Sequence, residues 1–157
     1  MTQLHEDPSV DPSKVEVLLA DDDAGHAALI RNNLRDVGLV NRIHHFEDGQ
    51  AVLDFLFDSD GKNRHSSPQN AYLLLLDIRM PKVSGVEVLR RIKGDEQLKL
   101  LPVIILTTTD DPREVRTCHE LGCNEYITKP VGYEQFVEVI RRLGLFLQIV
   151  RVPKLEV

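Results

Sequence analysis

Features that direct proteins to membranes, metals or redox chemistry are scarce in this sequence. It has no tryptophan, two cysteines and no apolar run close to the ~20 residues that a membrane-spanning helix requires. Cys118 and Cys123 form no C-x-x-C pair, so we expect two reduced thiols in the core. The six histidines show no metal-ligand spacing and receive no predicted role.

Positive charge is also in short supply, since 19 basic residues stand against 25 acidic ones and the net charge is -6. Nucleic-acid binding depends on a basic face that neutralises phosphates, so no direct contact with DNA or RNA is expected. Residues 1–13 lack the basic start and apolar stretch of a signal peptide. We therefore expect a cytoplasmic protein that does not enter a membrane.

Short apolar runs alternate with segments of helical periodicity, a pattern typical of an α/β protein with a parallel sheet. The first, third and fourth runs are nearly all apolar, as central strands covered on both faces must be. Right-handed crossovers favour a doubly wound sheet with strand order 2-1-3-4-5. The expected strands are residues 15–20, 41–46, 72–76, 103–106 and 125–127.

Capping residues mark where the helices between these strands begin. Asp23 and Asp48 precede helical periodicity, Ser84 begins a capping box, and Asp111 is followed by a proline suited to the first helical position. We expect Asp23 to be a cap rather than a metal ligand. One domain over residues 15–150 accounts for the pattern, with a flexible extension at 1–14, a polar loop at 58–70 and a tail at 151–157.

The last helix, from about residue 133 to 150, has more apolar residues than one core-facing stripe requires. Two interpretations remain open. The excess either forms a surface for a partner or packs against the body of the same domain, because large exposed apolar patches are uncommon on monomers.

Acidic residues follow two of the expected central strands. Asp77 ends the third apolar run, and Asp21 and Asp22 end the first. In this strand order the chain reverses direction between these strands, so the three carboxylates meet at the carboxyl edge of the sheet. Their mutual repulsion requires a cation, and oxygen ligands of this kind suit Mg²⁺. The sequence therefore predicts a divalent metal site.

A metal-bound carboxylate at an exposed strand end is a feasible nucleophile toward phosphorus, giving an aspartyl phosphate. Thr107 would bring a hydroxyl to the same edge after the fourth strand, and Lys129 would bring a positive charge after the fifth. Each successive strand thus contributes one group to the neutralisation of a phosphoryl group.

Separated motifs occur here in the order found in receiver domains. Together they resemble a response-regulator receiver, the phosphoacceptor half of a two-component system, over about residues 15–150. The resemblance implies a flavodoxin-like receiver fold. The motifs are Asp21-Asp22, residues 76–81, Gly85, Thr107, and Lys129-Pro130 preceded by Tyr126.

The resemblance implies that Asp77 is phosphorylated with Mg²⁺ or Mn²⁺ as cofactor. Asp22 would be a direct ligand, Asp21 a ligand mainly through water, and the carbonyl of Arg79 a backbone ligand. At the position of Arg79 the family often has a small or neutral residue. The charged arm here could change water attack on the phosphate, so the lifetime of the phosphorylated form is left open.

The remaining motif residues would form the switch. The resemblance implies that Lys129 contacts the phosphoryl oxygens, that Thr107 swings its hydroxyl onto the phosphate, and that Tyr126 rotates into the vacated space. This movement would change the surface made by the fourth helix, the fifth strand and the fifth helix.

Partners also follow from the resemblance: a sensor histidine kinase and a downstream protein that reads the switch. The chain is similar to single-domain regulators that accompany bacterial phytochromes, which implies a phytochrome-type kinase and a homodimer through the switching surface. Two alternative functions stand beside this one. One is a receiver-like scaffold that is never phosphorylated. The other is a phosphatase of the haloacid-dehalogenase type, which needs an Asp where Arg79 stands.

Overall fold

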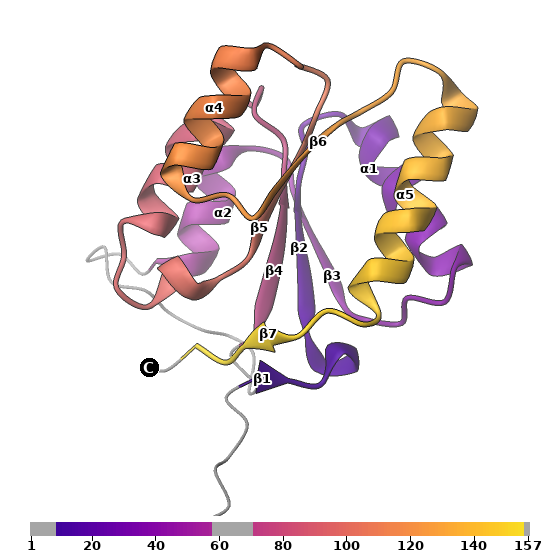
Figure 1. Ribbon diagram of the computed structural model, residues 1–157, viewed down its shortest axis with the longest axis horizontal. Coiled ribbons are helices and arrows are strands. Elements are labelled where there is room, and N and C mark those ends of the chain that lie inside the picture. Colours follow the sequence, from indigo (N-terminus) through magenta and orange to yellow (C-terminus); the bar gives the residue numbers. More distant parts are fainter. Residues whose placement is uncertain (1–8, 58–70, 156–157) are drawn as a thin grey trace, which may run out of the picture.

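The computed structural model describes residues 9–57 and 71–155, so the loop expected at 58–70 lies outside the described residues. The centre is a five-stranded parallel sheet in the order β3-β2-β4-β5-β6, which confirms the predicted order (Figure 1). Its strands are β2 (Glu16–Ala20), β3 (Ile43–Phe46), β4 (Tyr72–Leu76), β5 (Val103–Thr107) and β6 (Glu125–Thr128).

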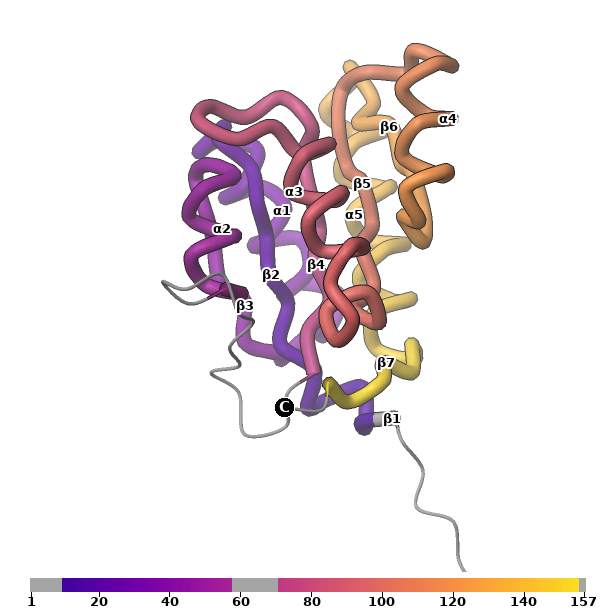
Figure 2. Tube along the Cα trace, turned by 90° about the vertical axis from the view of Figure 1, so that its left-hand side faces the viewer, coloured from indigo at the N-terminus to yellow at the C-terminus, as the bar shows by residue number. Residues whose placement is uncertain are grey.

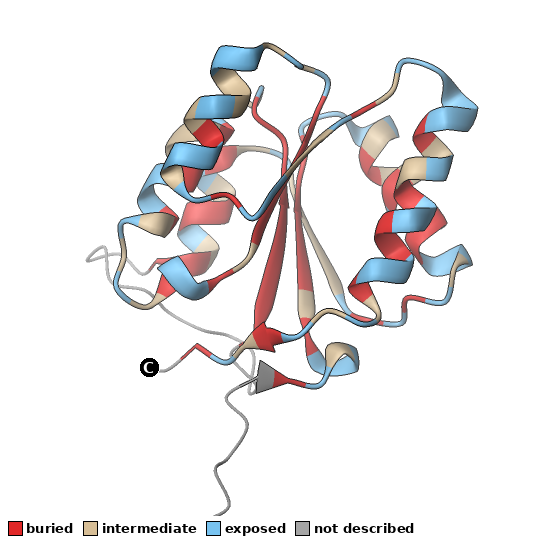
Figure 3. Ribbon diagram, viewed as in Figure 1, coloured by how far each residue is buried: buried red, intermediate tan, exposed pale blue. Residues whose placement is uncertain are grey.

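Burial follows the apolar pattern of the strands. Every residue of β4 and β5 is buried, and so are four of the five residues of β2, whereas β3 and β6 lie at the edges and are partly exposed (Figure 3). The central strands are covered on both faces, as their continuous apolar sequence predicts.

Helices cover both faces of the sheet (Figures 1 and 2). Each face buries its own apolar cluster. α1 (Ala24–Asp36) and α5 (Tyr133–Leu147) lie together on one face. The other face carries α2 (Gly49–Leu56), α3 (Gly85–Lys93) and α4 (Pro112–Leu121).

The capping predictions are confirmed at four helix starts. The side chains of Asp23, Asp48, Ser84 and Asp111 each accept a hydrogen bond from a backbone N–H of the following turn. These bonds satisfy donors that a helix leaves unpaired at its start. Asp23 is therefore a cap.

The terminal segments differ from the expected extension and tail. At the amino end of the sheet, β1 (Ser9–Val10) pairs antiparallel with β7 (Val152–Pro153) (Figure 1). A 3-10 turn at Pro12–Lys14 follows β1. Val10, Val152 and Leu155 are buried. We call residues 9–14 and 151–155 the terminal clasp. Apolar side chains on both segments find partners that no local pattern reveals, so part of each expected tail belongs to the fold.

The structure partly shows where the surplus apolar residues of the last helix, α5, lie. It ends at Leu147, three residues earlier than expected. Phe136, Ile140 and Leu143 are buried on the α1 side. Leu145, Phe146 and Ile149 remain 57%, 43% and 73% exposed, so apolar surface is left over after the domain core is filled.

Across the described residues, no helix combines the length and apolar character needed to cross a bilayer.

Candidate functional site

Three carboxylates converge at the carboxyl edge of the sheet. β2 and β4 are neighbours in register, with Ala20 opposite Leu76, so the residues that follow them are level. The N–H of Asp77 donates to the carbonyl of Ala20 at 2.9 Å. As a result, one oxygen each of Asp21, Asp22 and Asp77 lies within 4.8 Å of the others.

Lys129 follows β6 and brings an ammonium group to these carboxylates. Its Nζ donates to Asp21 Oδ2 at 2.6 Å and to Asp77 Oδ2 at 3.3 Å. The hydroxyl of Thr107, at the end of β5, donates to the other oxygen of Asp77 at 2.7 Å. Both oxygens of Asp77 are thus held, and the structure brings together five of the predicted side chains.

The charge balance of the cluster favours a further cation. Burial raises the pKa of Asp21, because water no longer solvates its charge, and the hydrogen bond from Lys129 partly offsets this rise. One ammonium faces three carboxylates, of which only Asp22 is exposed. An all-carboxylate donor set is what a hard divalent cation prefers, so these residues fit a metal site.

The loop after Asp77 depends on the absence of a side chain at Gly85. Its N–H donates to the carbonyl of Ile78 at 2.8 Å, which closes the loop at the start of α3. A Cβ on Gly85 would lie 2.1 Å from the carbonyl oxygen of Asp77. Any larger residue would therefore displace the backbone that carries the acceptor carboxylate.

The polar groups of Arg79 and Tyr126 bond to residues outside the carboxylate cluster at the sheet edge. The guanidinium of Arg79 pairs with Glu114 of α4, with 3.4 Å between Nη2 and Oε2. Thr109 donates its hydroxyl to the same oxygen, and Tyr126 donates its hydroxyl to the carbonyl of Thr109 at 2.7 Å. Burial, aided by the charge of Glu114, raises the pKa of Tyr126 to about 12. The loop after β5 therefore connects the site to α4.

Comparison with known proteins agrees with this geometry. A family described as the response regulator receiver domain matches residues 17–141. The chain belongs to the response regulator receivers. Receiver domains are typically phosphoacceptors rather than classical enzymes, and a two-component receiver implies a histidine kinase as partner.

Similar receivers include several of known structure. One from Rhodospirillum rubrum is 45% identical, with a TM-score of 0.87 over 91% of this chain and 100% of that one. Response regulator Rcp1 from Synechocystis sp. is 32% identical over 90% of this chain and 95% of its own length. Its Mn²⁺-bound form has a TM-score of 0.76 over 88% and 99% of the two chains. The phosphorylated cyanobacterial phytochrome response regulator RcpA is 26% identical, with a TM-score of 0.75 over 86% and 94%.

Two histidines that received no predicted role touch this receiver's site. His45 Nε2 lies 2.9 Å from the carbonyl of Asp21, and His26 Nδ1 lies 3.1 Å from Lys129 Nζ. His26 is four positions after Asp22 in the first turn of α1, which is a usable signal for its closeness to the acidic pair. His45 reaches Asp21 because β3 pairs with β2 in this register, and although the strand order predicted the pairing, the sequence has no local sign of the register.

Proposed function

We propose that this receiver is a cytoplasmic protein that accepts a phosphoryl group from a sensor histidine kinase on Asp77 and signals through the surface of α4, β6 and α5. The observation that carries the proposal is the pair of hydrogen bonds from Thr107 and Lys129 to the two oxygens of Asp77. They surround a carboxylate that is 8% exposed and shares its pocket with two more. A scaffold that is never phosphorylated has no use for this costly arrangement.

In the transfer, a carboxylate oxygen of Asp77 attacks the phosphorus of the kinase phosphohistidine, a P–O bond forms, and the P–N bond breaks as the imidazole leaves. Lys129 neutralises the transferred oxygens. Asp21, Asp22, Asp77 and the carbonyl of Arg79 would hold Mg²⁺, which supplies further neutralisation when bound. The same groups would support later hydrolysis by water, so self-catalysed transfer and dephosphorylation are the whole of the chemistry.

The switch would run through the loop that follows β5. Thr107 now donates to Asp77, and a phosphoryl oxygen would become its new acceptor. Thr109, two residues on, holds the hydroxyl of Tyr126 and a carboxylate oxygen of Glu114. A shift of Thr107 therefore reaches β6 and α4 through one short segment. Such a switch requires two arrangements of similar energy that the phosphoryl group biases.

Incubation with acetyl phosphate and Mg²⁺, followed by intact mass measurement, tests the acceptor. We expect one added phosphoryl group in the wild type and none in Asp77→Asn or after chelation of the metal. An unmodified wild type would favour the scaffold alternative. Turnover of small phosphoesters would favour the phosphatase alternative.

We further infer that the partner is a phytochrome-type kinase. The likeness to the phytochrome regulator RcpA and to the bacteriophytochrome response regulator AtBRR, at 26% and 33% identity, supports this class of partner. Transfer assays with a panel of histidine kinases test it. Faster transfer from kinases with no phytochrome module would contradict it.

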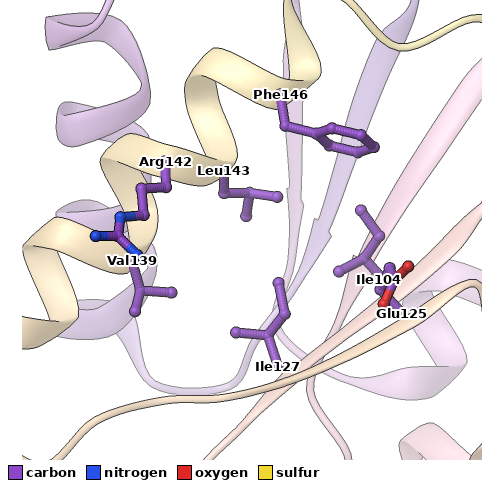
Figure 4. Close-up of a pocket in the computed structure, with 7 residues that line it drawn as sticks. All are labelled: Ile104, Glu125, Ile127, Val139, Arg142, Leu143 and Phe146. Carbon is purple, nitrogen blue, oxygen red and sulfur yellow. The ribbon is translucent and has the colours of Figure 1, made fainter.

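We also propose that two copies pair through α4, β6 and α5. A groove of about 390 Å³ lies between β6 and α5 and is lined mainly by apolar side chains, among them Ile127, Leu143 and Phe146 (Figure 4). Glu125 and Arg142 also line the groove. In a two-fold pair, each charge can meet its opposite on the second copy. β6 is an edge strand of the sheet and leaves this side open to a partner.

Sedimentation at micromolar concentration tests the pairing. We expect a dimer that Phe146→Ser weakens, and no change in the control Val40→Ser, whose side chain is 78% exposed. Only monomer in the wild type, with and without a phosphate analogue, would refute the dimer.

A further inference from the structure

Lys129 has three acceptors, and one of them is not a carboxylate. Besides its bonds to Asp21 and Asp77, its Nζ lies 3.1 Å from Nδ1 of His26. An ammonium group only donates, so Nδ1 accepts and the ring proton is on Nε2. Lys129 is 3% exposed, and these three contacts match its three N–H bonds.

The ring of His26 is held in place by two helices. Its backbone N–H donates to Asp23 Oδ1 at 3.0 Å in the first turn of α1. The imidazole meets the ring of Phe136 on α5 edge-on, with 5.4 Å between centroids. The charged groups that face Nδ1 are Lys129 and Asp23, whose Oδ2 is 3.7 Å away. The acceptor is therefore pre-positioned beside the ammonium.

Lys129 and a divalent cation need the same carboxylates. The bond of 2.6 Å occupies Asp21 Oδ2, in the pocket where the acidic side chains converge. Two cations that share this pocket repel each other, so the ammonium must weaken its bond to Asp21 when a metal binds. Lys129 is only 3% exposed, so bulk water compensates little for the lost acceptor, and an unpaired buried charge is costly.

We propose that His26 is a positioning residue that keeps Lys129 beside Asp77 when a divalent cation takes Asp21. Its Nδ1 is a neutral acceptor, so it can hold the ammonium without competing for the cation. Lys129 then stays near Asp77, where an incoming phosphoryl group needs it. This inference rests on the proposed function, since it concerns the same site.

Two substitutions at His26 separate hydrogen bonding from packing. Asparagine places its amide oxygen where Nδ1 stands but has no ring to pack on Phe136. Phenylalanine keeps the ring and lacks the acceptor. If the acceptor matters, His26→Asn resembles the wild type and His26→Phe is impaired. If only packing matters, the order is reversed.

The primary measurement is the dissociation constant of Mg²⁺ and of Mn²⁺ by titration calorimetry on the full chain. We expect His26→Phe to weaken binding about tenfold, the lower end of what a hydrogen bond to a charged group contributes. His26→Asn should stay within about twofold of the wild type. The second readout is the rate of phosphorylation by acetyl phosphate at saturating metal, which should follow the same order.

His119→Phe is the matched control, because His119 is an exposed histidine on α4 and its ring contacts Cys123 instead of the site. If His26→Phe does not fold, His26→Leu replaces it. Unchanged metal affinity in the variant that lacks an acceptor, or equal losses in both variants, would overturn the role of His26. A wild type that binds metal but is never phosphorylated would instead overturn the proposed function, and the titrations would still report on His26.

Discussion

The two ends of the sheet differ in how their buried polar groups are paired. At the amino end, the terminal clasp buries Val10, Val152 and Leu155, and the amide of Asn41 donates to the carbonyls of Pro12 and Val15 at 2.6 and 2.7 Å. Both acceptors of this amide are neutral carbonyls. At the carboxyl end, two buried carboxylates share one buried ammonium.

The amino end of the sheet contributes to stability, whereas the carboxyl end carries the functional site. The buried side chains of the clasp are apolar, and the Asn41 amide beside them bonds to neutral carbonyls. Buried charges at the carboxyl end carry a desolvation cost that their mutual attraction only partly offsets. Such a cluster gains stability when a cation binds, so the carboxyl end responds to a ligand, whereas the charged residues of the clasp are exposed.

The largest expected effect is at the carboxyl end. Lys129→Met removes the only side-chain ammonium hydrogen-bonded to Asp77 among the described residues. We expect the rate of phosphorylation by acetyl phosphate to fall by about 100-fold or more, as when one preorganised electrostatic group is lost. Lys154→Met, an exposed lysine in the clasp, is the control and should leave the rate unchanged. Similar phosphorylation rates in Lys129→Met and Lys154→Met would contradict the difference between the two ends of the sheet.

In the clasp, we expect a substitution to lower stability and to leave the phosphorylation rate unchanged. Leu155 is 1% exposed and packs into the core cluster on the face that carries α2, α3 and α4. Leu155→Ala should lower the free energy of unfolding by about 2 kcal/mol, the low end for a buried leucine near a chain end. Urea denaturation measures this loss, and the phosphorylation rate of the folded variant should match the wild type. A variant of full stability would show that the clasp does not support the fold.

A smaller effect concerns pH and Asp21. Its native pKa is raised by burial above the ordinary value of about 3.9, so the native state binds more protons than the unfolded state between these two values. Stability therefore falls as pH rises through this window and stays lower above it. Asp21→Asn removes this loss, so without metal the variant should be more stable than the wild type at pH 7.

Urea titrations from pH 4 to pH 8 with a chelator measure the difference between the two proteins. Mg²⁺ should shrink that difference, because the cation stabilises only the carboxylate form. A lower stability of the variant across the whole range would contradict the assigned cost of the buried charge.

The smallest effect is expected for the pair formed by Arg79 and Glu114. The guanidinium is 72% exposed, and exposed ion pairs contribute little. Arg79→Ala should change the free energy of unfolding by less than about 0.5 kcal/mol. A double-mutant cycle with Glu114→Ala isolates the coupling energy between the two side chains. A coupling energy well above this bound would show that the pair stabilises the fold. Decay of the phosphorylated form in the same variants would test whether Arg79 affects water attack.

Much of this receiver could be predicted from local patterns. Continuous apolar runs predicted the central strands β2, β4 and β5, and capping residues such as Asp48 and Ser84 predicted helix starts. Parallel strands end at a common edge, so residues placed just after β2, β4, β5 and β6 had to meet. The convergence of Asp21, Asp77 and Lys129 follows from that rule.

Only the tertiary structure decided the contacts that depend on the exact placement of distant segments. The bond between His26 and Lys129 joins residues 103 positions apart, and the clasp pairs the two ends of the described chain. The pair of Arg79 and Glu114 likewise depends on how α4 packs beside the loop after β4. Apolar periodicity and capping act within a few residues, so they determine the elements and the edge where chemistry gathers. Which neighbour a side chain finds there is set by packing across the sheet, and no local pattern encodes it.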